Sequence, residues 1–239
     1  MAIKDYVDRA KADYDKVFEA GKKSEYDKLW DAFQGLGNRA NYIRAFSGNY
    51  WNNENFKPKY PIKPSDDASY MFDNTGLTDF DFVEKGIVLD ISKATSVTYM
   101  FRNAKGIKRI GIFDCYTSRK NVNRPFYGCC IETIDEFVSY DDTVYVSTFR
   151  YATELKNITM SGVIASNSLS FGSCTLLSKD SLYSIINCLS NETDGLSIEL
   201  SLQAVNKAFE TSTDANDGST SSEWLTLTGT KSNWTISLV

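Results

Sequence analysis

Histidine is absent from the 239 residues of this sequence. Its absence excludes serine and cysteine nucleophiles that rely on a histidine base, and every metal site built on imidazole ligands. A glycine-rich phosphate loop is missing too, because Gly35 and Gly37 follow a predicted helix instead of joining a strand to a helix. We therefore expect no cofactor and no metal centre.

Basic runs and long apolar runs are also missing. The net charge is −5 and the Lys and Arg residues are dispersed, whereas nucleic-acid binding needs clustered positive charge. No apolar stretch approaches the roughly 20 residues of a membrane-spanning helix, and residues 1–5 lack the apolar core of a secretory signal. We expect a protein that binds no nucleic acid, does not insert into a membrane and carries no signal peptide.

The five cysteines form an odd set without the spacing of metal ligands. Two of them, Cys129 and Cys174, occupy a position where equivalent segments of the repeat described below carry Thr or Ala. Because unpaired cysteine is among the most buried residue types, we predict that these two thiols are small core groups.

Pairs of carboxylates are present, and a glycosidase needs two carboxylates at a set separation. Solvated carboxylates in turns and on surfaces are the more frequent explanation of such pairs, so an enzyme is a distant alternative. The pairs are Asp66 with Asp67, Asp79 with Asp81, and Asp141 with Asp142.

One short pattern recurs five times between Ser69 and Leu177. An aromatic anchor is followed three places later by a small residue and at five or six places by an aliphatic residue. Successive anchors are 29, 25, 23 and 22 residues apart, which is too short for separate domains and typical of solenoid coils that bury their aliphatic residues against one another. The anchors are Phe72, Phe101, Phe126, Phe149 and Phe171.

A strand pattern follows each of the first four anchors. The segments 77–82, 107–112 and 155–160 read apolar-x-x-apolar-x-apolar, and their last three positions alternate as in a strand; segment 131–136 has Glu at the third apolar position. Stacked coils would join these strands into a parallel ladder with outward side chains about 4.8 Å apart, which suits extended ligands such as glycans or peptides. The alternative is a face that is only solvated. The candidate ligand-binding residues are Asp79, Asp81, Arg109, Thr133, Asp135, Asn157 and Thr159.

Residues 1–64 precede the repeat. Residues 3–17 carry an a/d heptad seam on a helix that reaches about Ala20, and Ser24 begins a second helix. Two alternatives stand for the seam: a short coiled coil that joins copies into a homo-oligomer, or an amphipathic helix packed on its own domain. Residues 38–65 are rich in Asn, Tyr and Pro, and we expect their aromatic side chains to cover the open end of the first coil. Phe46 fits a further anchor of the series.

Residues 178–239 follow the repeat, which itself occupies 65–177. Ser178 begins a predicted helix, residues 197–202 alternate as a strand, and residues 205–209 fit another short helix. Residues 224–228 and 234–238 alternate on either side of a glycine-containing turn, which predicts a hairpin. We interpret this region as a mixed α/β C-terminal cap.

The segment LDISKATSVTYMF, residues 89–101, together with YMF at 70–72, resembles the D-x-S-x-x-T-x-M-x-x-M-F units of BspA-like leucine-rich-repeat proteins. The flanking segments 19–27, 56–60, 177–182 and 233–235 resemble the ends of such proteins in gut bacteria and their phages. The resemblance implies a leucine-rich-repeat-type β-solenoid with irregular coils of 22–29 residues, N-terminal helices and a C-terminal cap. It also implies non-catalytic binding or adhesion at a surface.

Our first hypothesis is a non-catalytic binding or structural module of a phage tail or a similar particle, which recognises a glycan or a protein on the host surface. It places the protein on a virion or at an extracellular surface. A bacterial cell-surface adhesin is the second hypothesis, which shares the fold but needs an export signal. A glycan-active enzyme is a distant third.

Overall fold

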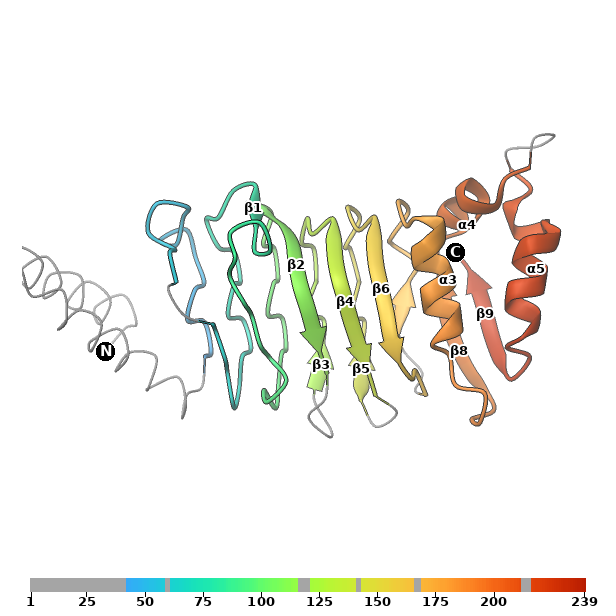
Figure 1. The fold of residues 1–239 in the computed structure, drawn as a ribbon, viewed down its shortest axis with the longest axis horizontal. Helices are drawn as coiled ribbons and strands as arrows, with labels where there is room; N and C mark the ends of the chain where they lie inside the picture. The colour runs from blue at the N-terminus through green and yellow to red at the C-terminus, as the bar shows by residue number, and fades with distance from the viewer. Residues whose placement is uncertain (1–41, 59–60, 116–120, 141–142, 166–168, 212–215) are drawn as a thin grey trace, which may run out of the picture.

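The computed structural model describes residues 42–58, 61–115, 121–140, 143–165, 169–211 and 216–239 (Figure 1). The helices expected within residues 1–37, including the heptad seam, lie outside these ranges. None of the helices in the described ranges combines the length and the apolarity needed to cross a membrane. The elements are β1 (Phe80–Asp81), β2 (Ile107–Asp114), β3 (Asn121–Asn123), β4 (Thr133–Ser139), β5 (Val144–Val146), β6 (Asn157–Gly162), β7 (Ser170–Phe171), α3 (Lys179–Asn187), β8 (Leu196–Leu200), α4 (Leu202–Phe209), the 3-10 helix η1 (Gly218–Thr220), α5 (Ser222–Gly229) and β9 (Trp234–Leu238).

The strands form three parallel sheets. In Figure 1 the strands β1, β2, β4 and β6 succeed one another along the long axis, β3 and β5 lie beside β2 and β4, and β8 and β9 follow toward the C-terminal end. The main sheet has the order β1-β2-β4-β6, with β3 and β5 forming a separate pair. Equivalent residues of successive layers are hydrogen-bonded neighbours, so that Arg109 faces Thr133 and Thr133 faces Asn157. We call this main sheet the strand ladder.

The turn around each anchor Phe also stacks on the next layer. The amides of Tyr99, Phe101 and Asn103 donate to carbonyl oxygens of residues 123, 125 and 127 at 2.7–3.0 Å. The same three bonds recur around Phe46, Phe72 and Phe126. Because alternate amides bond to the neighbouring layer, the backbone of these anchor turns is satisfied without regular strands.

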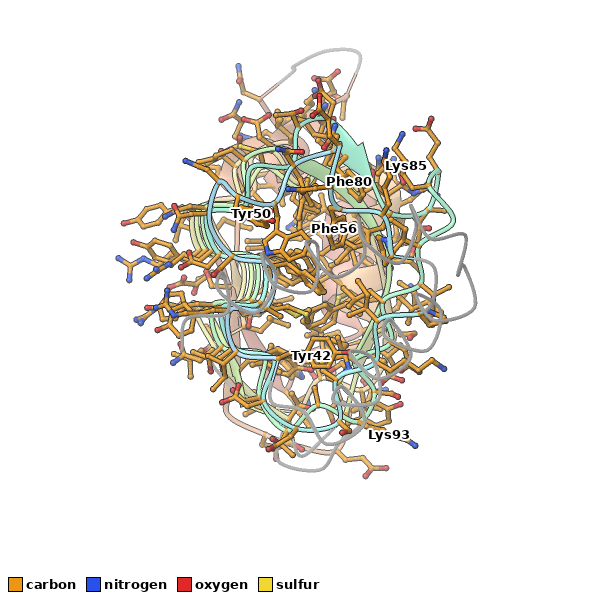
Figure 2. The ribbon with its side chains drawn as sticks, turned by 90° about the vertical axis from the view of Figure 1, so that its left-hand side faces the viewer. Tyr42, Tyr50, Phe56, Phe80, Lys85 and Lys93 are labelled. Atoms are coloured by element: carbon orange, nitrogen blue, oxygen red, sulfur yellow. The ribbon has the colours of Figure 1, made fainter. Side chains whose placement is uncertain are left out.

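The anchor rings form one column through the core. Phe46, Phe72, Phe101, Phe126, Phe149 and Phe171 are buried, and successive ring centroids lie 4.5–5.6 Å apart. The prediction that the anchors are core residues is therefore confirmed, and Phe46 belongs to the series. Trp51 and Phe56 are buried edge-on against Phe46, as expected of aromatic side chains that cover the first layer. Figure 2 looks along the stack, with Phe56 and Phe80 near its centre.

Small residues follow the anchors where the backbone turns toward the ladder. Cys129 and Cys174 are buried free thiols at this position, which confirms the prediction for both. Burial raises the pKa of the Cys129 thiol to about 12 and raises that of Cys174 further. Both side chains therefore stay protonated at neutral pH and pack as small apolar groups.

The alternation predicted for the ladder strands is wrong in two layers. The pattern predicts that Ile112 is buried, but its side chain is 54% exposed and Phe113 is buried instead. Phe137 likewise takes the buried position that the pattern gave to Glu136. Between β4 and β6 two residues of β4 oppose one of β6, a bulge that shifts the buried side chain by one place.

The C-terminal region packs its first helix on the ladder. Ser178 is the N-cap of α3, as predicted, and its hydroxyl accepts a hydrogen bond from the Ser181 amide. The predicted helix at 205–209 corresponds to α4, and the predicted strand at 197–202 corresponds closely to β8. Strands β7, β8 and β9 form the third parallel sheet.

The predicted hairpin at 224–238 is wrong. Residues 222–229 form α5, because Ser221 accepts a hydrogen bond from the Trp224 amide as N-cap, and Trp224 and Leu227 bury one helix face. β9 then pairs parallel to β8, which a tight hairpin cannot achieve; α4, η1 and α5 form the crossover.

Candidate binding surface

The open face of the strand ladder carries the predicted site residues in layered rows. Register brings Arg109, Thr133 and Asn157 side by side on β2, β4 and β6. Asn157 and Thr159 are exposed, and the two residues that flank Ile158 point away from the core because Ile158 is buried. Three neighbouring strands therefore present polar side chains to the same side.

Arg109 and Asp135 bind each other across β2 and β4. The guanidinium Nε and Nη2 donate to the two carboxylate oxygens at 2.7 and 3.0 Å. This hydrogen bonding raises the pKa of Arg109. The two side chains are 41% and 31% exposed, so solvent screens the ion pair and it contributes little to stability. It fixes the direction of both side chains at the edge of the candidate surface.

The two aspartates predicted on β1 and just before it have other surroundings. Asp81 accepts hydrogen bonds from the amides of Val83 and Glu84 at 2.8 and 2.9 Å, and so stabilises the turn after β1. Asp79 is exposed with a φ of 45°, at the corner that leads into the strand. Neither residue lines the depression described next.

Four of the seven predicted residues line one shallow, open depression of about 530 Å³. It lies where β4, β6 and the first turns of α3 meet, near the middle of Figure 1. The lining residues are Thr133, Ile134, Asp135, Asn157, Ile158, Thr159, Ser178, Asp180, Ser181 and Ser184. We call this hollow the ladder depression.

Helix α3 closes the free edge of β6 through its serine side chains. The amides of Ile158 and Met160 donate to the hydroxyls of Ser181 and Ser184 at 2.9 and 3.1 Å. The Ser184 hydroxyl in turn donates to the Ile158 carbonyl at 3.1 Å. Since these groups would otherwise be an unpaired strand edge, the helix ends the ladder and forms one wall of the depression.

Four polar side chains in the depression have no hydrogen-bond partner among the described residues. They are Thr133, Asn157 and Thr159, whose backbones pair in the ladder, and Asp180 on α3. Two hydroxyls and an amide supply both donors and acceptors, and the carboxylate adds acceptors and one negative charge. This set suits a hydroxyl-rich ligand without negative charge better than an anion.

A column of alternating charge borders the ladder at the residues just before the rows. Glu132 lies between Lys108 and Lys156, with nitrogen–oxygen distances of 3.1 and 2.6 Å. Hydrogen bonds from Lys156 and then Lys108 lower the pKa of Glu132, and Glu132 raises the pKa of Lys108. The three side chains neutralise most of one another, so the border adds little net charge.

The contribution of α3 is the part of the site that the sequence pattern missed. Ser178 is predictable as an N-cap, but nothing in the sequence says that its helix lies along β6. Asp180 and Ser184 therefore enter the lining without having been candidates. Within the described ranges, no group of three or more Cys, Asp or Glu residues is placed to hold a metal ion.

No protein-family model matches this chain, and neither a curated protein nor a solved structure matches it.

Proposed function

We propose that this protein is a non-catalytic binding module, built as a solenoid of the leucine-rich-repeat type, which recognises an extended glycan on a host surface. The observation that carries the proposal is the convergence of Thr133, Asp135, Asn157 and Thr159 on the ladder depression. Strand periodicity predicts outward positions for these residues, and α3 completes a hollow around them.

The depression has the properties of a weak, repetitive binding site. It is shallow and open, and it offers hydroxyl and amide groups on a rigid parallel sheet. Polyhydroxylated sugars pair with such groups, and each contact exchanges one hydrogen bond to water for another, so the gain per contact is modest. Attachment at a surface would then depend on several sites acting together.

A homo-oligomer would supply those several sites. The heptad seam in residues 3–17 is the sequence feature that supports oligomerisation. Light scattering of the whole chain and of a chain without residues 1–20 tests this part. We expect a multiple of the 26.9 kDa chain mass for the first and the mass of one shortened chain for the second. A monomer in both cases would refute it.

A glycan array carrying bacterial surface polysaccharides tests the binding function. We expect the wild-type protein to be retained on a subset of these glycans and to release no sugar from them. The double variant Asn157→Ala/Thr159→Ala should lose retention. Ser197→Ala/Thr235→Ala is the matched control, since it removes two side chains of similar type from exposed positions on β8 and β9.

Three results would count against this function. Retention that is equal in both double variants would move the site away from the ladder. If the wild-type protein were retained on no glycan of the array, the ligand would not be a glycan, and a host protein would remain as the partner. Sugar release without retention would favour a glycan-active enzyme.

The cellular setting is a separate part of the proposal. The solenoid and the heptad seam in residues 3–17 support a phage tail or similar particle, with a bacterial surface adhesin as the alternative. Mass spectrometry of purified virions and of washed cell envelopes distinguishes the two. Detection in virions is the result we expect.

A further inference from the structure

Arginine and tyrosine side chains gather along the anchor turns. Seen along the stack, side chains with nitrogen tips and aromatic rings with oxygen tips project together from the left side of the molecule (Figure 2). In each layer, arginine and tyrosine occupy one or two of three positions, which lie two before, one after and two after the anchor Phe. We call them the arginine–tyrosine strip: Arg44, Tyr70, Tyr99, Arg102, Arg124, Tyr127, Arg150 and Tyr151.

The first half of the strip is one continuous stack. The rings of Tyr70 and Tyr99 are stacked with centroids 5.4 Å apart. The guanidinium group of Arg44 lies 4.7 Å from the centroid of Tyr70, and that of Arg102 lies 5.0 and 5.3 Å from Tyr70 and Tyr99. Cation–π contact therefore holds these charges in a fixed row on the surface.

The second half continues the row through edge contacts. Tyr127 meets Tyr99 and Tyr151 edge to face, at centroid distances of 5.9 and 5.2 Å. Arg124 donates to the Tyr99 hydroxyl at 2.9 Å, and Arg150 lies 5.1 Å from the ring of Tyr151. The strip thus spans the layers from Phe46 to Phe149.

The charge of the strip opposes that of the whole chain. Four arginines lie on it, and the only acid at the outward positions of these five turns is Asp73. The Asp73 side chain is 3% exposed, and Arg102 holds both of its carboxylate oxygens at 2.8 and 2.6 Å. The net charge of the chain is −5, so this positive row is a local feature and not the general composition of the surface.

The backbone makes the choice of these side chains unusual. Arg44, Tyr70, Tyr99, Arg124 and Tyr151 have φ between 52° and 62°. The left-handed region disfavours bulky side chains. At the place of Tyr151 the other layers hold Gly or Asn, as at Gly128 and Asn103, and at the place of the other four the layer of Phe149 holds the small Ser147. Strained positions that keep large side chains point to a role beyond stability.

We propose that the arginine–tyrosine strip binds an acidic polysaccharide along the stack of layers. The planar guanidinium fork matches carboxylate and sulfate groups, and phenol hydroxyls bond to sugar hydroxyls. A linear polymer with many charges matches a row to which four of the five layers contribute one arginine each. The surface is separate from the ladder depression, and its ligand differs in charge, so this proposal does not depend on the neutral ligand proposed there.

Two other polyanions fit the strip less well. Single-stranded nucleic acid stacks its bases on open aromatic faces, whereas the facing sides of Tyr70 and Tyr99 cover each other and guanidinium groups lie over these rings. An acidic peptide that adds as a strand needs free backbone amides, and the amides of Phe72, Phe101 and Phe126 already donate to the neighbouring layer.

Biolayer interferometry on immobilised polygalacturonate, a carboxylated polysaccharide, tests the proposal. The wild-type chain should bind polygalacturonate but not dextran, its uncharged counterpart, and binding should weaken as NaCl is added. Arg44→Gln/Arg150→Gln should raise the Kd roughly tenfold or more. The control Lys85→Gln/Lys93→Gln removes the same charge on the right side of Figure 2 and should leave the Kd within about twofold.

The charge-keeping variant Arg44→Lys/Arg150→Lys should bind polygalacturonate more tightly than the double Gln variant but less tightly than wild type. All variants should have the melting temperature of wild type. The proposal fails if the wild-type protein does not bind polygalacturonate or binds dextran equally well. It also fails if the two double Gln variants bind polygalacturonate with the same affinity. It also fails if polyglutamate or oligothymidylate binds more tightly than polygalacturonate. The variant Asn157→Ala/Thr159→Ala should bind polygalacturonate normally, which separates this test from that of the ladder depression.

Discussion

Removing one ring from the middle of the phenylalanine column should destabilise the protein strongly. Phe101 is fully buried and stacks between Phe72 at 5.3 Å and Phe126 at 5.6 Å, with rings parallel to within 4°. Phe101→Ala leaves a cavity whose two flanking rings are too far apart to meet. Such a change in a core costs about 3–5 kcal/mol of the free energy of unfolding.

Part of that cost belongs to ring stacking. A stacked aromatic pair is worth about 0.5–1.5 kcal/mol beyond the area that it buries, and Phe101 takes part in two such pairs. Phe101→Leu keeps an apolar group in the site and loses both stacks. Its cost should therefore lie well below that of Phe101→Ala, at about 1–3 kcal/mol.

Urea unfolding monitored by circular dichroism measures both values. Thr153→Ala, at an exposed turn position, is the control and should stay within about 0.5 kcal/mol of wild type. If Phe101→Ala cost less than about 1 kcal/mol, the layers would not share a continuous core and the reasoning on stacked layers would be wrong.

Three further changes test other contacts. Gly106→Ala should lower the free energy of unfolding in urea by more than about 1 kcal/mol, because the added Cβ would lie 1.8 Å from the Leu77 carbonyl oxygen. At Gly229 an added Cβ meets nothing within 4 Å, so Gly229→Ala should be neutral or slightly stabilising. Equal costs would contradict the close approach of layers. Asp73→Asn should lower the free energy of unfolding by about 1–3 kcal/mol. Loss of a fully buried ion pair would cost more, but Arg102 is 31% exposed. An unchanged melting temperature would contradict this prediction. The double variant Cys129→Ala/Cys174→Ala should change the free energy of unfolding at pH 7 by no more than about 1.5 kcal/mol per site. The raised pKa of both thiols makes their contribution complete below pH 9 and lost as pH rises toward 12. Wild-type stability should therefore fall more steeply than that of the double variant between pH 9 and 12, by up to about 1.4 kcal/mol per pH unit and thiol. Parallel pH profiles would refute the burial argument.

The core column was predictable because one residue type marks it in every layer. Phe101 and Phe149 recur with a small residue three places later, and burial of an aromatic ring dominates the local energetics. The bulge at Asp135 and Glu136 was not predictable, because a strand with one extra residue differs little in pattern from a regular strand.

The prediction of a strand at 224–228 was wrong for a related reason, because a short segment can fit two periodicities. In a stretch this short, Trp224 and Leu227 fit the three-residue spacing of a helix, but the same stretch also contains an alternating set. Ser221 as N-cap decides for the helix. A capping signal should therefore outweigh alternation in segments of this length.

Only four of the ten residues that line the ladder depression were predicted from the sequence. Outward positions on a ladder follow from strand periodicity, which is why Thr133 and Asn157 were found. The docking of α3 is a tertiary contact made through Ser181 and Ser184, and no local pattern reports it. The arginine–tyrosine strip was not predicted, because only the stacking of the layers brings Tyr70, Tyr99 and Tyr127 into contact.

Hydrogen exchange with a glycan retained on the array tests the proposed binding face most directly. Peptides that cover 133–136, 157–160 and 178–184 line the ladder depression, and their amides should exchange more slowly when that glycan is present. Peptides from β8, α5 and β9 should exchange at the same rate with and without it. Protection confined to 196–239, or none in β4, β6 and α3, would contradict the assignment of the ladder as the binding surface.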